Sequence, residues 1–92
     1  MYLIYPTRSY RKDYKRLLKR KSLDEDELDQ LIGILIAGGK LDAKYRDHRL
    51  SGKLSDLNEC HLRNANLLIY KVALEEKVLY LSRIGTHTDL FE

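Results

Sequence analysis

Cysteine and proline are scarce in this chain. It has one cysteine, Cys60, and one proline among its 92 residues. A lone cysteine cannot close an intrachain disulfide, which excludes folds that depend on disulfide bonds and favours a reducing compartment. A chain of this length with one proline has room for a single small domain, residues 1–92, and for no long linker.

Long apolar runs are also absent. No stretch approaches the roughly 18 apolar residues that a transmembrane helix needs. Residues 1–12 carry their charges after the apolar segment, which is the reverse of a secretory signal peptide. Internal repeats and low-complexity segments are missing as well. We therefore expect a cytoplasmic domain that makes no contact with a membrane.

Positive charge is concentrated at the N-terminal end. Residues 1–22 contain eight lysines and arginines and one acid, whereas residues 23–44 are mainly acidic and the remainder is balanced. Dense positive charge attracts polyanions, because each neutralised phosphate releases condensed counterions. Nucleic acid is thus the first partner to consider, and a helix face that only increases solubility is the alternative.

Hydrophobic spacing predicts one strand and two helices in the first half. Residues 2–5 are β-prone and end at Pro6. Thr7 is a suitable N-cap for an amphipathic, basic helix. Asp24 caps a second helix, which ends at a pair of glycines. The two helices should form an antiparallel hairpin.

The second half has the alternation of β-strands. Strands are predicted at residues 57–62, 66–73 and 77–84. The middle strand is apolar on both faces, as a central strand is. Residues 40–53 predict an ordered loop, and Gly85 should end the last strand. The order predicts an α+β domain of β-α-α-β-β-β topology, with the helical hairpin on one face of an antiparallel sheet.

Alternation also predicts which side chains share a face. Glu59 and His61 fall on one face of their strand, and Cys60 falls on the other. In the last strand, Leu81 and Arg83 should point to the same side.

All three histidines, His48, His61 and His87, lie in the second half. Histidine transfers protons readily near neutral pH. Cleavage of RNA by the neighbouring 2′-hydroxyl needs a base, an acid and a cation for the phosphate, and histidine with arginine can fill these roles without a metal. Zinc is the alternative, but the histidine spacings match no compact ligand pattern, and Cys60 should point away from His61.

Four blocks of the second half are distinctive together. They are Tyr45-Arg46-Asp47-His48-Arg49-Leu50, Glu59-Cys60-His61-Leu62, Leu68-Ile69-Tyr70-Lys71 and Arg83-Ile84-Gly85-Thr86-His87-Thr88-Asp89-Leu90-Phe91. In order and spacing they resemble the RelE/ParE toxin superfamily, and its YafQ branch in particular. The resemblance implies a RelE-like fold and a toxin of a type II toxin–antitoxin pair. It also implies an endoribonuclease that cuts messenger RNA in the ribosomal A site.

The resemblance assigns roles to the three histidines. His87 matches the principal catalytic histidine, expected to act as general acid or base. His48 and His61 match two further active-site histidines, one of which would be its partner in proton transfer. No cofactor and no metal are expected.

Three further residues match positions that contact the substrate. Arg83 matches the arginine that would hold the scissile phosphate, for which its forked guanidinium is suited. Phe91 matches an aromatic that would stack on a base, and Lys53 is also assigned to substrate binding. The alternatives are a structural ion pair for Arg83 and a place in the core for Phe91.

One position departs from the family pattern. Where this branch carries an acidic and an aromatic residue after the second histidine, the chain has Ala65 and Asn66. A carboxylate there would orient a histidine; Asn64 or Asn66 could do so by hydrogen bonding, but without charge. The departure predicts either weaker activity or a site that relies on His48 and His87.

The resemblance gives the basic first helix a role. It would bind ribosomal RNA, and the same surface could bind an acidic antitoxin, through which alone the protein would reach operator DNA. The residues predicted to contact ribosomal RNA are Arg11, Lys12, Lys15, Arg16 and Lys19. Two other functions stay open: a ParE-like toxin that inhibits a protein such as DNA gyrase, and a homologue that mainly binds its antitoxin. The three histidines favour the nuclease.

Overall fold

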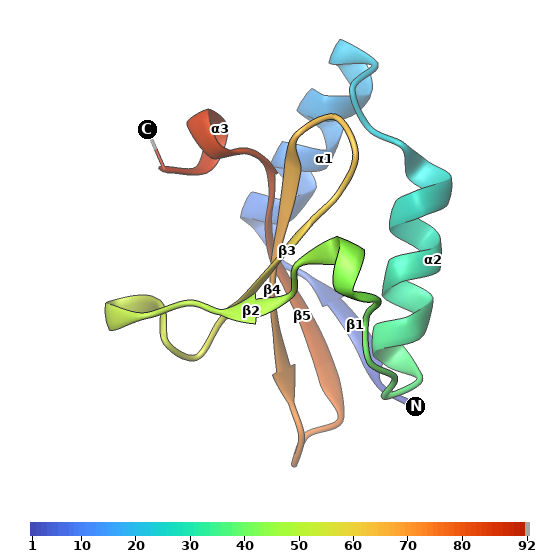
Figure 1. Cartoon of the computed structure of the whole chain (residues 1–92), viewed down its shortest axis with the longest axis vertical. Coiled ribbons are helices and arrows are strands. Elements are labelled where there is room, and N and C mark those ends of the chain that lie inside the picture. The colour runs from blue at the N-terminus through green and yellow to red at the C-terminus, as the bar shows by residue number, and fades with distance from the viewer. Residues whose placement is uncertain (92) are drawn as a thin grey trace.

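The N-terminal strand and the two helices form where the spacing predicts them. The structure is a computed structural model that describes residues 1–91. It places β1 at Leu3–Pro6, α1 at Arg8–Arg20 and α2 at Glu25–Ile36. The side chains of Thr7 and Asp24 accept hydrogen bonds from the first turns of these helices, as N-caps do. Figure 1 shows α1 and α2 running in opposite directions, which confirms the hairpin.

The rest of the described chain, up to residue 91, forms four strands and three short helical segments. These are η1 (Ala43–Tyr45), β2 (His48–Arg49), η2 (Gly52–Leu54), β3 (Asn58–His61), β4 (Asn66–Ala73), β5 (Val78–Thr86) and α3 (His87–Phe91). The sheet order is β1-β5-β4-β3-β2, so β4 is central as predicted. Every neighbouring pair is antiparallel except β1 with β5, which is parallel. The α+β class and the strand order along the chain are confirmed. None of the described helices is long and apolar enough to cross a membrane.

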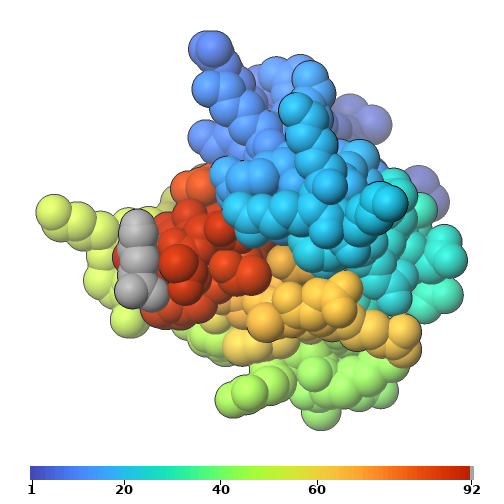
Figure 2. All heavy atoms as spheres, turned by 90° about the horizontal axis from the view of Figure 1, so that it is seen from above, coloured from blue at the N-terminus to red at the C-terminus, as the bar shows by residue number. Residues whose placement is uncertain are grey.

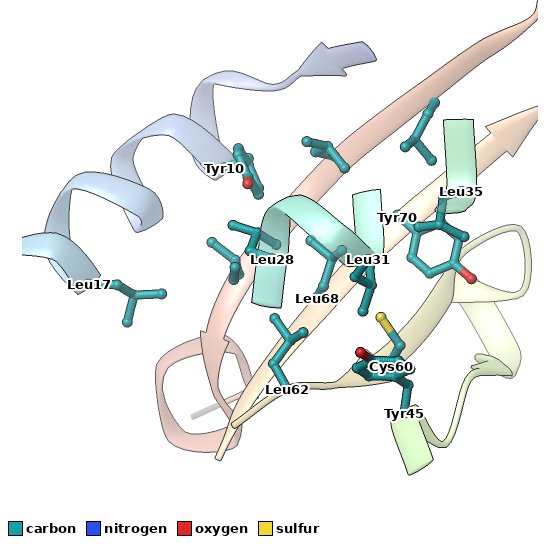
Figure 3. Close-up of a cluster of buried hydrophobic side chains, with 13 residues drawn as sticks. Tyr10, Leu17, Leu28, Leu31, Leu35, Tyr45, Cys60, Leu62, Leu68 and Tyr70 are labelled. Carbon is teal, nitrogen blue, oxygen red and sulfur yellow. The ribbon is translucent and has the colours of Figure 1, made fainter. Parts of the chain in front are cut away.

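Both helices pack on one face of the sheet. Leu17 of α1, Leu31 of α2 and Leu68 of β4 belong to one buried cluster, shown in Figure 3. Cys60 lies in the same cluster and therefore points away from His61, as predicted. Burial raises the pKa of the Cys60 thiol, which disfavours the reactive thiolate.

Arg83 does not share a face with Leu81, so that prediction is wrong. The β4–β5 ladder shifts register: Tyr70 pairs with Leu81, but Ile69 pairs with Arg83, which leaves Ser82 as an extra residue. A bulge of this kind reverses the alternation of the strand beyond it. Leu81 stays in the core, and Arg83 turns to the face of the sheet that the helices leave uncovered.

Two strand boundaries also differ from the prediction. Gly85 does not end the last strand; it pairs with Leu67, and β5 continues to Thr86. The segment 40–53, predicted as a loop, contains β2, in which His48 pairs with Glu59. A strand of two residues shows no alternation, so the sequence pattern could not reveal it.

Candidate active site

Strand pairing places the charged residues in one row across the sheet. His48 of β2 pairs with Glu59 of β3, Glu59 pairs with Ile69 of β4, and Ile69 pairs with Arg83 of β5. Residues directly opposite one another in a sheet project to the same side. Arg83 is two strands from Glu59, or about 10 Å between backbones. The row therefore presents an imidazole, a carboxylate and a cation on one face of the sheet, with His48 and Arg83 three strands apart.

A second row on the same face adds His61. His61 pairs with Leu67, and Leu67 pairs with Gly85 two residues before His87. Leu67 and Ile69 are both buried, yet neither belongs to the core cluster on the helix side. They form an apolar floor between the histidines of β2 and β3 and the end of β5.

Glu59 lies between two of the three histidines. Its Oε1 atom is 3.5 Å from His48 Nε2 and 3.7 Å from His61 Nε2. The side chain of Glu59 is 11% exposed, whereas those of His48 and His61 are 50% and 35% exposed. The carboxylate is thus largely covered, and the two imidazoles are presented to solvent.

The hydrogen bond on the other side of the His48 ring assigns its protons. His48 Nδ1 lies 2.8 Å from the carbonyl oxygen of Arg46. A carbonyl can only accept a hydrogen bond, so Nδ1 carries the proton and, in the neutral ring, Nε2 is a bare acceptor. An unprotonated Nε2 is the form that a general base needs.

Sequence reasoning missed Glu59 as a site residue and concluded that the carboxylate was lost at Ala65. The structure supplies a carboxylate from β3 instead. One signal was available: alternation put Glu59 on the same face as His61. What could not be read from the sequence was the pairing with β2 that brings His48 to the same carboxylate.

The asparagines beside Ala65 do not orient a histidine through their amide nitrogens. Asn64 Nδ2 and Asn66 Nδ2 both donate to the carbonyl oxygen of Ser22, at 3.0 and 2.8 Å. These two hydrogen bonds hold the β3–β4 turn against the loop between α1 and α2. Ala65 adopts a positive φ of 59° in this turn. The amide nitrogens that could have oriented an imidazole thus bind the backbone of Ser22 instead.

His48, Glu59 and His61 could also hold a metal ion. One ligand atom from each residue lies within 4.8 Å of the others. Two imidazoles and a carboxylate form a donor set that suits zinc or copper. The spacing of the histidines along the chain had argued against a metal site. His48 is brought beside Glu59 and His61 by the pairing of β2 with β3, which that spacing does not reveal.

Arg83 makes an ion pair with a buried residue of α1. Asp13 is 2% exposed and accepts Arg83 Nε at 2.7 Å, Arg83 Nη2 at 3.1 Å and the amide of Ile84 at 3.1 Å. Arg16 Nη2 donates to the same carboxylate at 3.0 Å. The structural ion pair that was the alternative for Arg83 is therefore present. The ion pair uses Nε and Nη2 of Arg83, so Nη1 does not bind Asp13. The side chain of Arg83 is 36% exposed.

The C-terminal residues have their own arrangement. His87 and Phe91 are one helical turn apart in α3, with ring centroids 5.1 Å apart. Phe91 is 40% exposed and lies outside the core cluster, so it does not have the core position that was its alternative. Lys53 is exposed in η2. His87 and Lys53 are not among the groups that approach Glu59 within ion-pair distance in residues 1–91.

The basic face of α1 is largely open to solvent. Four of the five residues predicted to bind ribosomal RNA are exposed, and Arg16 is half-buried against Asp13. Arg11, Lys12 and Lys15 line a depression together with Arg8, which the prediction did not include. The four exposed residues are Arg11, Lys12, Lys15 and Lys19.

Comparison with known proteins decides the family. A family model described as "Bacterial toxin of type II toxin-antitoxin system, YafQ" matches residues 2–92. The chain belongs to the YafQ family. The resemblance to the YafQ branch is thereby confirmed.

Individual bacterial toxins are similar to this chain over nearly their whole length. The mRNA interferase toxin YafQ of Escherichia coli K12 is 37% identical over 83 residues, which cover 89% of this chain and 87% of that protein. A metal-bound toxin from Helicobacter pylori is 38% identical, with a TM-score of 0.90 over 99% of this chain and all of that one. YafQ in the E. coli DinJ–YafQ toxin–antitoxin complex is 35% identical, with a TM-score of 0.86 over 99% and 98% of the two chains.

Proposed function

We propose that this toxin is an endoribonuclease that cuts messenger RNA on the ribosome. The observation that carries the proposal is the row of His48, Glu59 and Arg83 on the uncovered face of the sheet, with His61 beside it. This row offers the proton acceptor and the phosphate-binding cation that cleavage by a 2′-hydroxyl needs. The name of the E. coli relative, an mRNA interferase, supports the same reaction.

Each group has one role in the proposed reaction. His48 Nε2 takes the proton of the 2′-hydroxyl, and Glu59 stabilises the positive charge that the ring gains. The 2′-oxygen attacks phosphorus, and Arg83 Nη1 stabilises the charge on the phosphoryl oxygens. The bond to the 5′-oxygen breaks, and His87 gives that oxygen a proton. The products are a 2′,3′-cyclic phosphate and a free 5′-hydroxyl.

The remaining residues position the substrate. Phe91 stacks on a base, Lys53 binds the RNA backbone, and His61 shares the carboxylate of Glu59 with His48. Proton transfer in this scheme requires no metal. A cation held by His48, Glu59 and His61 would occupy the lone pairs that accept protons and would therefore inhibit cleavage.

Primer extension on a translated message tests the proposal. Wild-type protein should produce new 3′ ends within the reading frame when ribosomes are translating, and none on the free RNA. The ends should persist when a chelator selective for zinc and copper is added at constant Mg²⁺, and they should disappear with His87→Ala. A folded wild-type protein that produces no new ends would contradict the proposal. It would favour the ParE-like inhibitor of a protein target or a homologue that only binds its antitoxin.

The proposed partner on α1 is ribosomal RNA, and the cognate antitoxin would compete for the same face. Four exposed cations lie along this helix, and three of them share a depression with Arg8. Close spacing of cations favours a phosphate backbone. The solved E. coli DinJ–YafQ complex shows that a relative binds an antitoxin, and an acidic antitoxin segment would match this charge. A toxin of this kind acts where ribosomes are, in the cytoplasm.

Removing the exposed charges of α1 should weaken ribosome binding. The variant Lys12→Gln/Lys15→Gln/Lys19→Gln is expected to lower affinity and to flatten the dependence of log K on log salt by up to about three units, because fewer counterions are released. Sedimentation with ribosomes over a salt series measures both. Removing three exposed lysines from α1 leaves the Asp13–Arg83 pair intact, so cleavage of a saturating substrate should be retained. Unchanged affinity and slope would rule out α1 as the ribosomal contact.

A further inference from the structure

The short helix α3 carries two of the proposed site residues, His87 and Phe91. It has five residues, which is too few for a helix to be stable by itself. Its position must therefore come from contacts with the rest of the chain. Four hydrogen bonds that connect α3 to other parts of the chain involve one residue, Asp89.

Asp89 joins α3 to the end of β5. Its Oδ2 atom accepts the amide of Thr86 at 3.1 Å, and Thr86 Oγ1 accepts the amide of Asp89 at 3.2 Å. This reciprocal pair is a capping box, which fixes the first turn of α3 relative to the strand. Gly85 allows the close approach: it has a φ of 156°, and a Cβ there would lie 3.0 Å from Asp89 Oδ2.

Arg20 joins the same carboxylate to α1. Its Nη1 and Nη2 atoms donate to Oδ2 and Oδ1 of Asp89, both at 3.1 Å, in a two-point contact. Figure 2 shows α3, in red, packed against α1, in blue. The Arg20 guanidinium and the Thr86 amide lower the pKa of Asp89 to about 2, so the carboxylate stays charged at neutral pH.

Arg20 is also the last residue of α1, the helix that carries the exposed lysines and arginines. The chain thus connects the basic surface of α1 to the helix that carries His87 through a single two-point ion pair. An isolated pair at the surface contributes little to stability. Its geometry matters more, because it sets the direction in which α3 leaves β5.

We propose that Arg20 and Asp89 are positioning residues that hold α3, and with it His87 and Phe91, in the orientation needed for cleavage. The proposal rests on the nuclease function proposed above, because only then does the position of His87 affect a rate. Neither residue contacts the reacting atoms. Their loss should therefore slow the chemical step through His87 and weaken substrate binding through Phe91.

Kinetics of two single variants and their double variant test the pair. Arg20→Gln and Asp89→Asn should each lower kcat by about tenfold, because a displaced acid slows the chemical step, and raise KM, because the stacking ring of Phe91 moves with α3. Asn can still accept the Thr86 amide, so the capping box is retained. Arg20→Gln/Asp89→Asn should be no slower than either single variant, since both remove the same contact. Arg20→Lys should recover part of the rate.

Lys21→Gln is the matched control. It removes one positive charge beside Arg20, at a residue that makes no ion pair in the described chain. Its kcat should equal that of the wild type. If Arg20→Gln behaves as Lys21→Gln does, or if the two single effects multiply in the double variant, the positioning role is wrong.

A readout without activity separates this proposal from the proposed function. In a proton–carbon NMR spectrum of labelled protein, Arg20→Gln should shift the ring signals of His87 and Phe91 and leave those of His48 and His61 in place. It should also speed hydrogen exchange in α3. If the wild type cuts no RNA but these changes occur, the positioning contact stands and the nuclease function fails. If α3 signals are unchanged, the positioning role fails whatever the activity.

Discussion

Glu59→Gln should lower kcat for messenger RNA cleavage by about 10²- to 10⁴-fold, which is the range expected when a group that supports proton transfer is removed. Glutamine keeps the shape of the side chain and can still contact His48 and His61. It cannot balance the positive charge that an imidazole gains on taking a proton. Primer extension in a single-turnover format measures the effect. KM should change little, because Glu59 is largely covered and lies beneath the imidazoles.

Glu75→Gln is the control for charge alone. Glu75 is exposed in the turn after β4. This turn lies at the opposite end of β4 from Leu67, the residue that pairs with His61, so Glu75 takes no part in the site. Its removal should leave kcat unchanged. Equal rates for Glu59→Gln and the wild type would contradict the role of the carboxylate. The site would then depend on the histidines alone, as the loss of an acid at Ala65 first suggested.

Asp13→Ala should destabilise the fold by about 3 kcal/mol and reduce activity as well. Asp13 accepts hydrogen bonds from Arg83, Arg16 and the buried amide of Ile84. Its removal leaves the buried amide of Ile84 without a partner, which costs about 1–3 kcal/mol, whereas Arg83 and Arg16 are partly exposed and can bind water. Arg83 would also lose the contact that holds it in the row with Glu59. Urea denaturation at neutral pH measures the stability, and cleavage assays below the unfolding range measure the rate.

Asp56→Ala provides the comparison for an exposed carboxylate. Asp56 pairs with Lys71 at 3.6 Å, and both side chains are well exposed. Its loss should change the free energy of unfolding by less than about 1 kcal/mol. Similar losses for Asp13→Ala and Asp56→Ala would show that the buried pair does not stabilise the fold.

The sequence determined the elements, because their signals are local. The caps Thr7 and Asp24 and the 3.6-residue spacing placed both helices, and the apolar run of β4 marked it as central. Four short blocks were enough to recognise the YafQ family, since they preserve the order and spacing of residues. They also pointed to the histidines and to Arg83.

Tertiary structure alone decided how these residues meet. The bulge at Ser82 turned Arg83 to the uncovered face, and the two-residue strand β2 carried His48 to Glu59. Both depend on pairing between segments far apart in the chain, which leaves no periodic pattern within either segment. The pairs that join Asp13 to Arg83 and Arg20 to Asp89 span 70 and 69 residues. A charge in a sequence does not name its partner, and only the packing of α1 against β5 and α3 chose these two.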